Sequence, residues 1–347
     1  MPKGEISNSQ HLRHNPLLYS KNKNIDFAII IEDDIENATE YVLREADVIL
    51  SEIIAVPTSK RTFANTLLRL DDLYDAVSKV SGPLELLSFV HPNRKIRDIS
   101  DESILIIERY FIELSANEAL YEVVYEFSTS KEAHELPINQ QRFLESELRD
   151  FQHSGLGLSE YDREKLKRIQ NRISELSLKF ENNISSYSDT LFIPHSMIAG
   201  LPDDYKENHL QADGKYAIDL SYPSFYPFME HAESDSLRKL LRYMFLNKGM
   251  PQNVPILSEI LANRKSLSAL LNYPSFSALI IDQGMAKSTK AVWAFERDLI
   301  EKIQQKANWD TEQLLQIKYG TIEENDKKIT DWQKDYYENQ LLLERHR

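Results

Sequence analysis

The sequence predicts a mainly α-helical protein, and two observations carry that prediction. Nine glycines in 347 residues are fewer than a sheet protein with many tight turns would use, and thirteen prolines fall between long runs rich in Leu, Ile, Glu and Lys. Apolar residues within those runs recur every three to four positions, which is the spacing of one helix face. We therefore expect a multi-helix lobe with long antiparallel helix pairs and a small β element around residues 190–222.

Local signals place the helix ends. Pro57 ends the first helix, Ser100, Ser159 and Ser234 are expected N-caps, and Gly320 is an expected C-terminal stop. In chain order, these criteria predict helices over residues 31–56, 63–80, 101–127, 139–155, 159–184, 234–246, 254–271, 288–307, 310–319 and 326–347.

The helix over 159–184 has the most regular pattern. Its apolar residues alternate by three and four like the core positions of a coiled coil; they are Leu166, Ile169, Ile173, Leu176, Phe180 and Ile184. Such a stripe needs a partner helix, and the preceding helix offers Leu144, Leu148 and Phe151. An antiparallel pair of these two helices is expected, although a purely structural coiled coil is disfavoured because the seam covers one helix only.

Between the helices, residues 189–229 change period. The segment LFIP is short and apolar, and Tyr216, Ile218 and Leu220 alternate with smaller or polar residues, as in a half-buried strand. We expect a flexible tail over residues 1–14 and one helical lobe over 15–347, with a sub-boundary near 189–230.

Composition excludes several function classes. A formal net charge of −14 argues against a nucleic-acid partner, because phosphate binding requires a concentrated basic surface. The absence of cysteine removes disulfides, thiolate metal sites and cysteine nucleophiles. No apolar run approaches the roughly 20 residues that span a bilayer, and no secretory apolar core is visible near the start. We expect a cytoplasmic protein that does not contact membranes.

Histidine motifs point to no metal site. The segment HELPI, His134–Ile138, resembles the zinc-protease signature, but it has isoleucine where the second histidine must stand, and Pro137 disrupts the helix. His11 and His14 are three residues apart in a polar tail without an acid at ligand spacing. We expect no metal ligand, catalytic residue or cofactor-binding residue in this chain.

Other candidate chemistry also has simpler explanations. The acidic groups Glu32–Asp34, Asp71–Asp72 and Asp203–Asp204 are expected at helix starts or on solvated faces. The aromatics of Tyr222–Phe228 could line a ligand, but packing against neighbouring helices is the expected role. No nucleophile elbow, phosphate-binding glycine loop or dinucleotide fingerprint occurs.

Several sequence segments, taken in chain order, resemble segments of a known family. They are RTFANTLLRLDDLYD (61–75), HPNRKIRDISDE (91–102), NQQRFLESELRDFQHSGLGLSEYDREKL (139–166), RISELSLKFENNI (172–184), IAGLP (198–202), YPSFYPFMEHAESDSLRKLLRYMF (222–245), NVPILSEILANRKSLSALLNYPSFSALIIDQGMAKS (253–288) and DWQKDYY (331–337). From about residue 15 to 347, the chain resembles the N-terminal half of the thimet oligopeptidase and oligopeptidase A family of zinc metallopeptidases.

The resemblance implies a largely helical protein that lines a channel for short peptides. It also implies that zinc, the HExxH helix and a downstream glutamate ligand lie in the later half of family members. No position of this chain matches those motifs, so the catalytic zinc lobe is expected to be absent and no residue role is carried over. If the chain is incomplete, surfaces that face the missing half should be apolar and exposed.

Two hypotheses follow from these observations. The leading one is the channel-wall portion of a zinc-dependent oligopeptidase that acts on short peptides together with a C-terminal catalytic half. The alternative is a non-catalytic helical module that binds peptides or a protein, or one subunit of a split oligopeptidase whose other chain carries HExxH.

Overall fold

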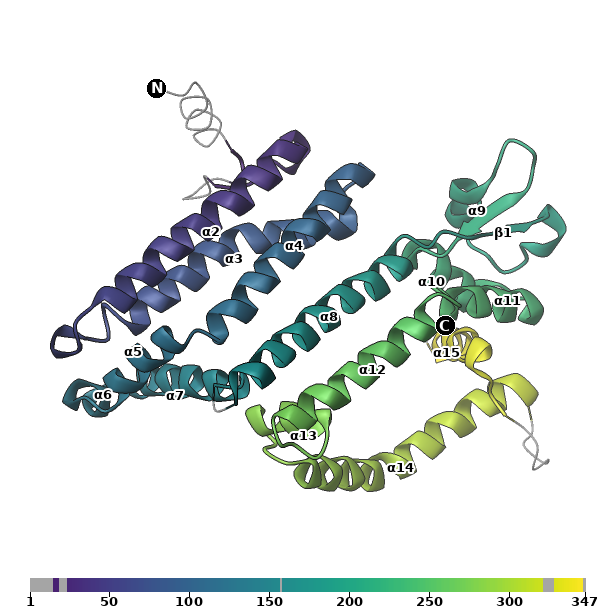
Figure 1. Ribbon diagram of the computed structural model, residues 1–347. Helices are drawn as coiled ribbons and strands as arrows, with labels where there is room; N and C mark the ends of the chain where they lie inside the picture. Colours follow the sequence, from purple (N-terminus) through teal and green to yellow (C-terminus); the bar gives the residue numbers. More distant parts are fainter. Residues whose placement is uncertain (1–14, 19–23, 157, 321–327, 346–347) are drawn as a thin grey trace. The chain divides into compact units, whose positions relative to one another are not determined.

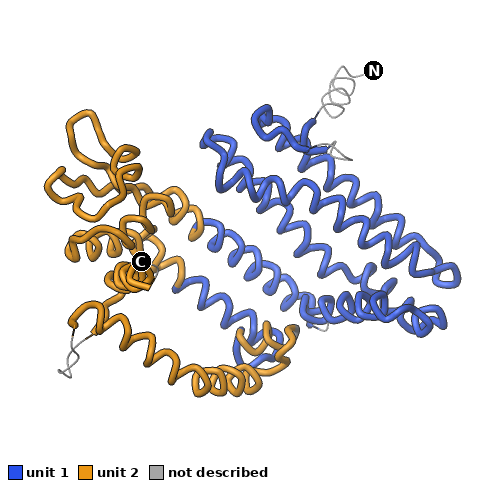
Figure 2. The backbone as a smooth tube through the Cα atoms, turned by 180° about the vertical axis from the view of Figure 1, so that it is seen from behind, with its two compact units in different colours: residues 1–179, 258–276 blue, residues 180–257, 277–347 orange. Residues whose placement is uncertain are grey.

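The protein is mainly α-helical, as a computed structural model shows (Figure 1). The structure describes residues 15–18, 24–156, 158–320 and 328–345, so the tail expected over residues 1–14 lies outside them. The chain divides into two compact units, coloured separately in Figure 2: residues 1–179 with 258–276, and residues 180–257 with 277–347. None of the described helices is long and apolar enough to cross a membrane.

Unit 1 is a bundle of helices. They are α2 (Glu32–Ala55), α3 (Leu67–Val90), α4 (Arg94–Ser115), α5 (Glu118–Ser128), α6 (Lys131–Glu135), α7 (Ile138–His153), the first part of α8 (Glu160–Ser185) and most of α12 (Asn253–Leu270). Short 3₁₀ turns at Phe27–Ile29 and Thr58–Lys60 flank α2.

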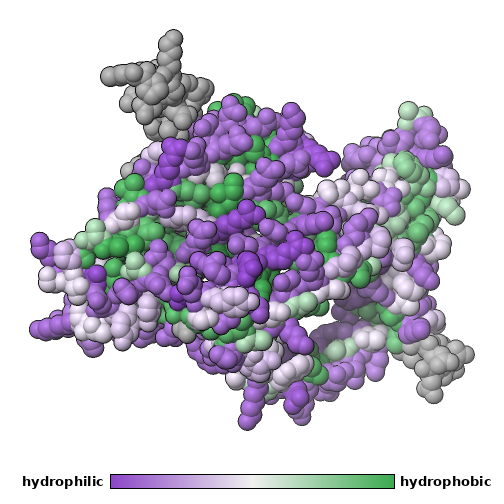
Figure 3. All heavy atoms as spheres, in the orientation of Figure 1, coloured by the Kyte–Doolittle hydropathy of each residue, from purple (hydrophilic) through white to green (hydrophobic). Residues whose placement is uncertain are grey.

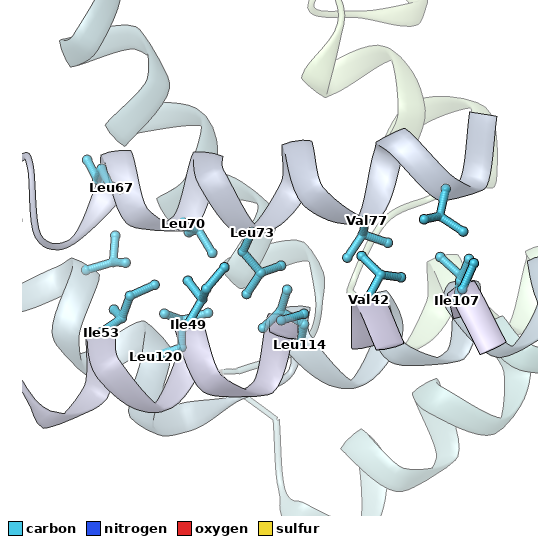
Figure 4. Close-up of a cluster of buried hydrophobic side chains, with 14 of the residues drawn as sticks. Val42, Ile49, Ile53, Leu67, Leu70, Leu73, Val77, Ile107, Leu114 and Leu120 are labelled. Atoms are coloured by element: carbon cyan, nitrogen blue, oxygen red, sulfur yellow. The ribbon is translucent and has the colours of Figure 1, made fainter. Parts of the chain in front are cut away.

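The core of unit 1 lies between α2, α3 and α4, which form the most extensive helix pairs of the molecule. Figure 4 shows Ile49 and Ile53 of α2 near Leu70 of α3, and Val42 of α2 near Val77 of α3. All five side chains are buried, and within each helix they are four or seven residues apart, which is one or two helical turns. Burial of each such side chain stabilises the fold by about 1.5–3 kcal/mol, so the predicted long antiparallel pairs are confirmed here.

Helix α3 continues ten residues beyond its predicted end at Val80. Gly82 and Pro83, two residues that disfavour helix, both lie inside it. Buried Leu84 and Leu87 explain the continuation, because their packing onto the core outweighs the one hydrogen bond that a proline removes.

The helix predicted over 101–127 was wrong at its start and in its middle. Asn93, rather than Ser100, caps α4 by accepting a hydrogen bond from the amide of Lys95 at 3.0 Å. Ser100 is inside α4 and donates to the carbonyl of Ile96 at 2.7 Å. Asn117 then caps a separate helix, α5, by accepting from the amide of Leu120.

The apolar face of α8 does not pack mainly against α7, which was its expected partner. Helix α7 packs against α5, whereas ion pairs join α8 to its other neighbours: Arg109 of α4 to Glu175 at 3.0 Å, and Arg172 to Glu259 of α12 at 2.6 Å. Within the seam, Leu166 and Leu176 are buried. The spacing therefore identified the helix and its buried face but not the partner.

Unit 2 combines helices with a two-stranded sheet. Its elements are β1 (Thr190–Ile193), a 3₁₀ turn at His195–Met197, α9 (Asp203–His209), β2 (Tyr216–Asp219), α10 (Tyr222–His231), α11 (Asp235–Leu246), α13 (Phe276–Gln283, from Ser277), α14 (Thr289–Tyr319) and α15 (Asp331–Arg345). The unit boundary also falls within α8 and α12.

The β element forms as predicted. Strands β1 and β2 pair antiparallel with Leu191 opposite Ile218 and Ile193 opposite Tyr216. These four side chains are buried, whereas Phe192 between them is exposed, which is the alternation of a sheet with one face on a core. The buried face packs with Phe225, Phe228 and other residues of α10 in the second core cluster.

Two helix predictions in unit 2 need correction. Residues 288–307 and 310–319 form one helix, α14, because the segment around Asn308 contains neither glycine nor proline to break it. The described part of the last helix begins at Asp331. Ser234 caps α11 through the amide of Leu237, and Gly320 ends α14 with φ of 76°, both as predicted.

Candidate functional site

Of the histidine motifs, only HELPI lies within the described residues. His134 lies in the five-residue helix α6, where its Nδ1 is 2.7 Å from the carbonyl oxygen of Ser130. His11 and His14 lie outside the described residues. In the described part of the chain, no three His, Asp or Glu side chains are grouped closely enough to hold a metal ion.

The acidic groups have the structural roles expected of them. Asp34 accepts a hydrogen bond from the amide of Ile31 at the start of α2, and Asp203 begins α9 and pairs with Lys206 at 3.0 Å. Asp72 lies on the outside of α3, 2.9 Å from Arg69. Each of these three carboxylates thus has a partner within its own segment, as expected of helix starts and solvated faces.

The aromatic segment forms helix α10 rather than a ligand wall. Phe225 and Phe228 are fully buried in the core of unit 2, and Phe225 stacks on Phe245 of α11 with ring centroids 3.9 Å apart. Tyr222 and Tyr226 lie on the exposed side. The expected packing role is confirmed for the two phenylalanines.

A buried arginine of α11 joins the end of α10 to α15. Arg238 is 1% exposed, and its guanidinium donates to the carbonyl oxygens of Ala232, Glu233 and Trp332 and to the carboxylate of Asp235. The ring of Tyr336 covers it at 4.1 Å. These hydrogen bonds offset the cost of removing the guanidinium charge from water. They also join α15, through Trp332, to the end of α10 at Ala232.

Asp235 is the acceptor that completes this network. It accepts hydrogen bonds from Nε2 of Gln333 at 2.7 Å and Nε1 of Trp332 at 3.1 Å, besides that from Arg238. Burial alone would raise the pKa of Asp235, but these donors and the charge of Arg238 hold the pKa below its usual value. Arg242 adds a two-bond ion pair with Asp331 at the start of α15.

Helix α14 is mostly exposed. Within the part of the chain that the structure describes, Leu314 in its last turns is its one buried residue, and α15 is its main neighbour. Upstream of these turns the helix is exposed, yet it carries a row of apolar side chains that we call the α14 stripe. The stripe consists of Val292, Trp293, Phe295, Leu299, Ile300 and Ile303.

The α14 stripe has the geometry of a buried helix face. Val292, Phe295, Leu299 and Ile303 follow one another at intervals of three and four, and Trp293 and Ile300 extend the row on one side. Such a stripe is as wide as the face that a helix normally turns to a core. Trp293 is nevertheless 61% exposed and Ile300 is 54% exposed. On the face that it presents, the space-filling view in Figure 3 shows hydrophobic patches among hydrophilic ones, without labelling the residues of the stripe.

Sequence reasoning missed both of these features. The Arg238 network joins residues nearly one hundred positions apart, and no local pattern reveals such a contact. The α14 stripe could have been found, because its three-to-four spacing is visible in the sequence, but spacing cannot show whether a face is covered.

Comparison with known proteins gives this helical arrangement a family. A family model described as "Neurolysin/Thimet oligopeptidase, N-terminal domain" matches residues 41–165, and a second, "Peptidase family M3", matches residues 228–347. The chain belongs to peptidase family M3. The matched regions include most of the α2–α4 core and the Arg238 network.

Curated relatives agree with the family M3 assignment. The chain is similar to the thimet-like oligopeptidase of Dictyostelium discoideum (27% identity over 325 residues; 90% of this chain and 48% of the relative). It is also similar to oligopeptidase A of Haemophilus influenzae (24%; 90% and 47%) and saccharolysin of Saccharomyces cerevisiae (25%; 79% and 43%). The chain thus spans about half the length of the family M3 proteins it matches.

Proposed function

We propose that this chain is the N-terminal, channel-wall portion of a zinc-dependent oligopeptidase that acts on short peptides. One observation carries the proposal: the N-terminal-domain model and the Peptidase family M3 model match in order along a chain that spans less than half of each of the relatives named above. Residues 15–347 would then be one helical lobe of the whole enzyme, and the zinc lobe would belong to the other half.

The residues that the structure describes do not fit a zinc centre of their own. The sequence contains no HExxH, and the described His, Asp and Glu side chains form no group that could hold the ion. We therefore assign no step of peptide hydrolysis to this chain. Its part would be to restrict the size of substrates and to position them, while the catalytic half supplies the metal centre.

The α14 stripe supports a docking role for unit 2. An uncovered apolar face of this width marks a site of association, and the catalytic half is the partner that family membership implies. A split oligopeptidase, with that half on a separate chain, would use the same stripe. The alternative of a non-catalytic helical module would use the stripe for a different protein.

Sequencing the transcript beyond the Arg347 codon separates these hypotheses. We expect an in-frame continuation that encodes HExxH and a later glutamate. A stop codon together with no peptidase half elsewhere in the genome would favour the non-catalytic module. A separately encoded half that restores cleavage of a quenched fluorescent peptide on mixing would establish the split enzyme.

The isolated chain provides a second test. We expect the purified 347 residues to bind no stoichiometric zinc by calorimetry and to cleave no peptide. Zinc-dependent turnover by the pure chain would overturn the assignment of the metal centre to the other half. A cytoplasmic location belongs to the same proposal and can be checked by cell fractionation.

A further inference from the structure

A groove of about 450 Å³ lies in unit 1 between α2 and α4. We call it the α2–α4 groove. Residues from Glu36 to Asp47 form one wall, and residues from Ile99 to Ile106 form the other. Its volume falls within the range of ligand sites in proteins, about 300–1,000 Å³. No feature of the family comparison assigns a role to it.

The floor of the groove is apolar. Leu43 of α2 and Ile99 of α4 are partly buried against the core of unit 1, and Ile106 is 47% exposed above them. These three side chains present branched aliphatic surface that a ligand could cover. Covering it would be favourable by about 25 cal/mol per Å² of apolar area removed from water.

The rim of the groove is acidic. Glu36, Glu40 and Asp47 line one wall and Glu102 the other, whereas Arg44 is the one basic group among the lining residues. Arg44 is already paired with Glu40. Within the described residues, neither Glu36 nor Glu102 has an ion-pair partner, so the rim offers uncompensated negative charge to a cationic ligand.

A serine side chain also lines the groove. Ser103 is only 3% exposed. Its neighbour across the groove, Thr39, donates to the carbonyl of Ile35 at 2.9 Å. The hydroxyl of Ser103 can donate to or accept from a backbone carbonyl or amide group of a ligand.

We propose that the α2–α4 groove binds a short peptide segment in which lysine or arginine alternates with aliphatic residues. The aliphatic side chains would cover Leu43 and Ile106, the cationic ones would reach Glu36 and Glu102, and the peptide backbone would meet Ser103. The α2 wall from Glu36 to Asp47 is about 16 Å long, which accommodates about five extended residues. The proposal is independent of whether the chain is part of an active peptidase.

Binding of a fluorescein-labelled Lys-Leu-Lys-Leu-Lys-Leu peptide, followed by anisotropy, tests this. We expect saturable binding that weakens as ionic strength rises towards about 0.15 M. The double variant Glu36→Lys/Glu102→Lys should bind at least about tenfold more weakly. The matched control is Glu45→Lys, an exposed α2 carboxylate outside the groove, which should bind within about twofold of wild type.

Two further arms separate specific binding from plain charge attraction. Ile106→Ser should weaken binding of the lysine–leucine peptide while circular dichroism shows an unchanged fold, because this side chain is half exposed. Spermine, a cation without aliphatic side chains, should compete poorly. Equal weakening by Glu45→Lys, equal binding of the corresponding glutamate–leucine peptide, tight competition by spermine, or no binding at all would overturn the proposal.

Discussion

Tyr74 of α3 donates a hydrogen bond of 2.9 Å to Oε2 of Glu147 of α7, a carboxylate that is only 8% exposed in unit 1. Burial raises the pKa of Glu147 to about 7, and the negative charges of Asp150 and Asp71 act in the same direction. The hydrogen bond from Tyr74 opposes them only in part. An ionisable pair thus joins two helices of the unit 1 bundle.

The stability of unit 1 should fall as pH rises through about 7. Because the pKa of Glu147 is higher in the folded state than the ordinary value of 4.5, its contribution is fully present below about pH 4.5 and is lost through pH 7. Glu147→Gln should remove about 1–3 kcal/mol of this pH dependence. Hydrogen exchange of α3 and α7 at pH 5 and 8 measures it.

The control for this prediction is Glu145→Gln, which changes an exposed carboxylate of the same helix. It should retain the wild-type dependence of protection on pH. If the two variants lost the dependence equally, the effect would belong to the general charge of α7 and not to the Tyr74–Glu147 pair.

Removal of the Arg238 guanidinium should loosen α15. Arg238→Met leaves the carbonyls of Ala232, Glu233 and Trp332 without their donors, which should cost about 2–4 kcal/mol. Hydrogen exchange of α15 should accelerate accordingly. Lys302→Met, at an exposed position of α14, should leave exchange of α15 unchanged; an equal acceleration there would contradict the anchoring role.

Two glycines with similar backbone angles should differ in their tolerance of alanine. Gly200 has φ of 84°, and a Cβ there would lie 2.2 Å from the carbonyl oxygen of His231; Gly214 has φ of 80° and open space around it. Gly214→Ala should cost about 1 kcal/mol for the left-handed conformation alone. Gly200→Ala should cost on the order of 3 kcal/mol. Denaturation monitored by circular dichroism compares them, and equal costs would refute the steric argument.

The α14 stripe should make the isolated chain self-associate. Ile303→Glu places a charge within the stripe and should shift sedimentation velocity profiles towards monomer, with little change in stability because the side chain is half exposed. Gln305→Glu adds the same charge at an exposed position outside the stripe and should not change association. A monomeric wild-type chain at high concentration would contradict the prediction.

How far the sequence determined the fold is clearest in unit 1 and at the sheet. Three features could be predicted from the sequence: the apolar face of α2, the alternation of β2 and the N-cap at Ser234. Each of them depends on residues within a few positions of one another. Helix ends were less reliable. Asn93 and Ser100 are both good N-caps, and the local sequence does not show which of them the tertiary packing uses.

For the candidate site, the sequence was informative about its motifs and not about its surfaces. The sequence shows directly that HELPI cannot form the paired-histidine site, because the second histidine is missing and Pro137 ends the short helix. It could not show that the stripe of α14 stays uncovered, nor that α2 and α4 leave a groove with Ser103 facing it. Both depend on which helices become neighbours.

By itself, the sequence determined the helical class, the period and face of most elements and the family relationship, because these follow from local spacing and from ordered motifs. Only the tertiary structure decided that Arg238 holds α15, that α7 packs on α5 and that Glu147 lies beside Tyr74. The physical reason is that burial and charge pairing are properties of contacts between distant segments, whereas helix periodicity is a property of one segment.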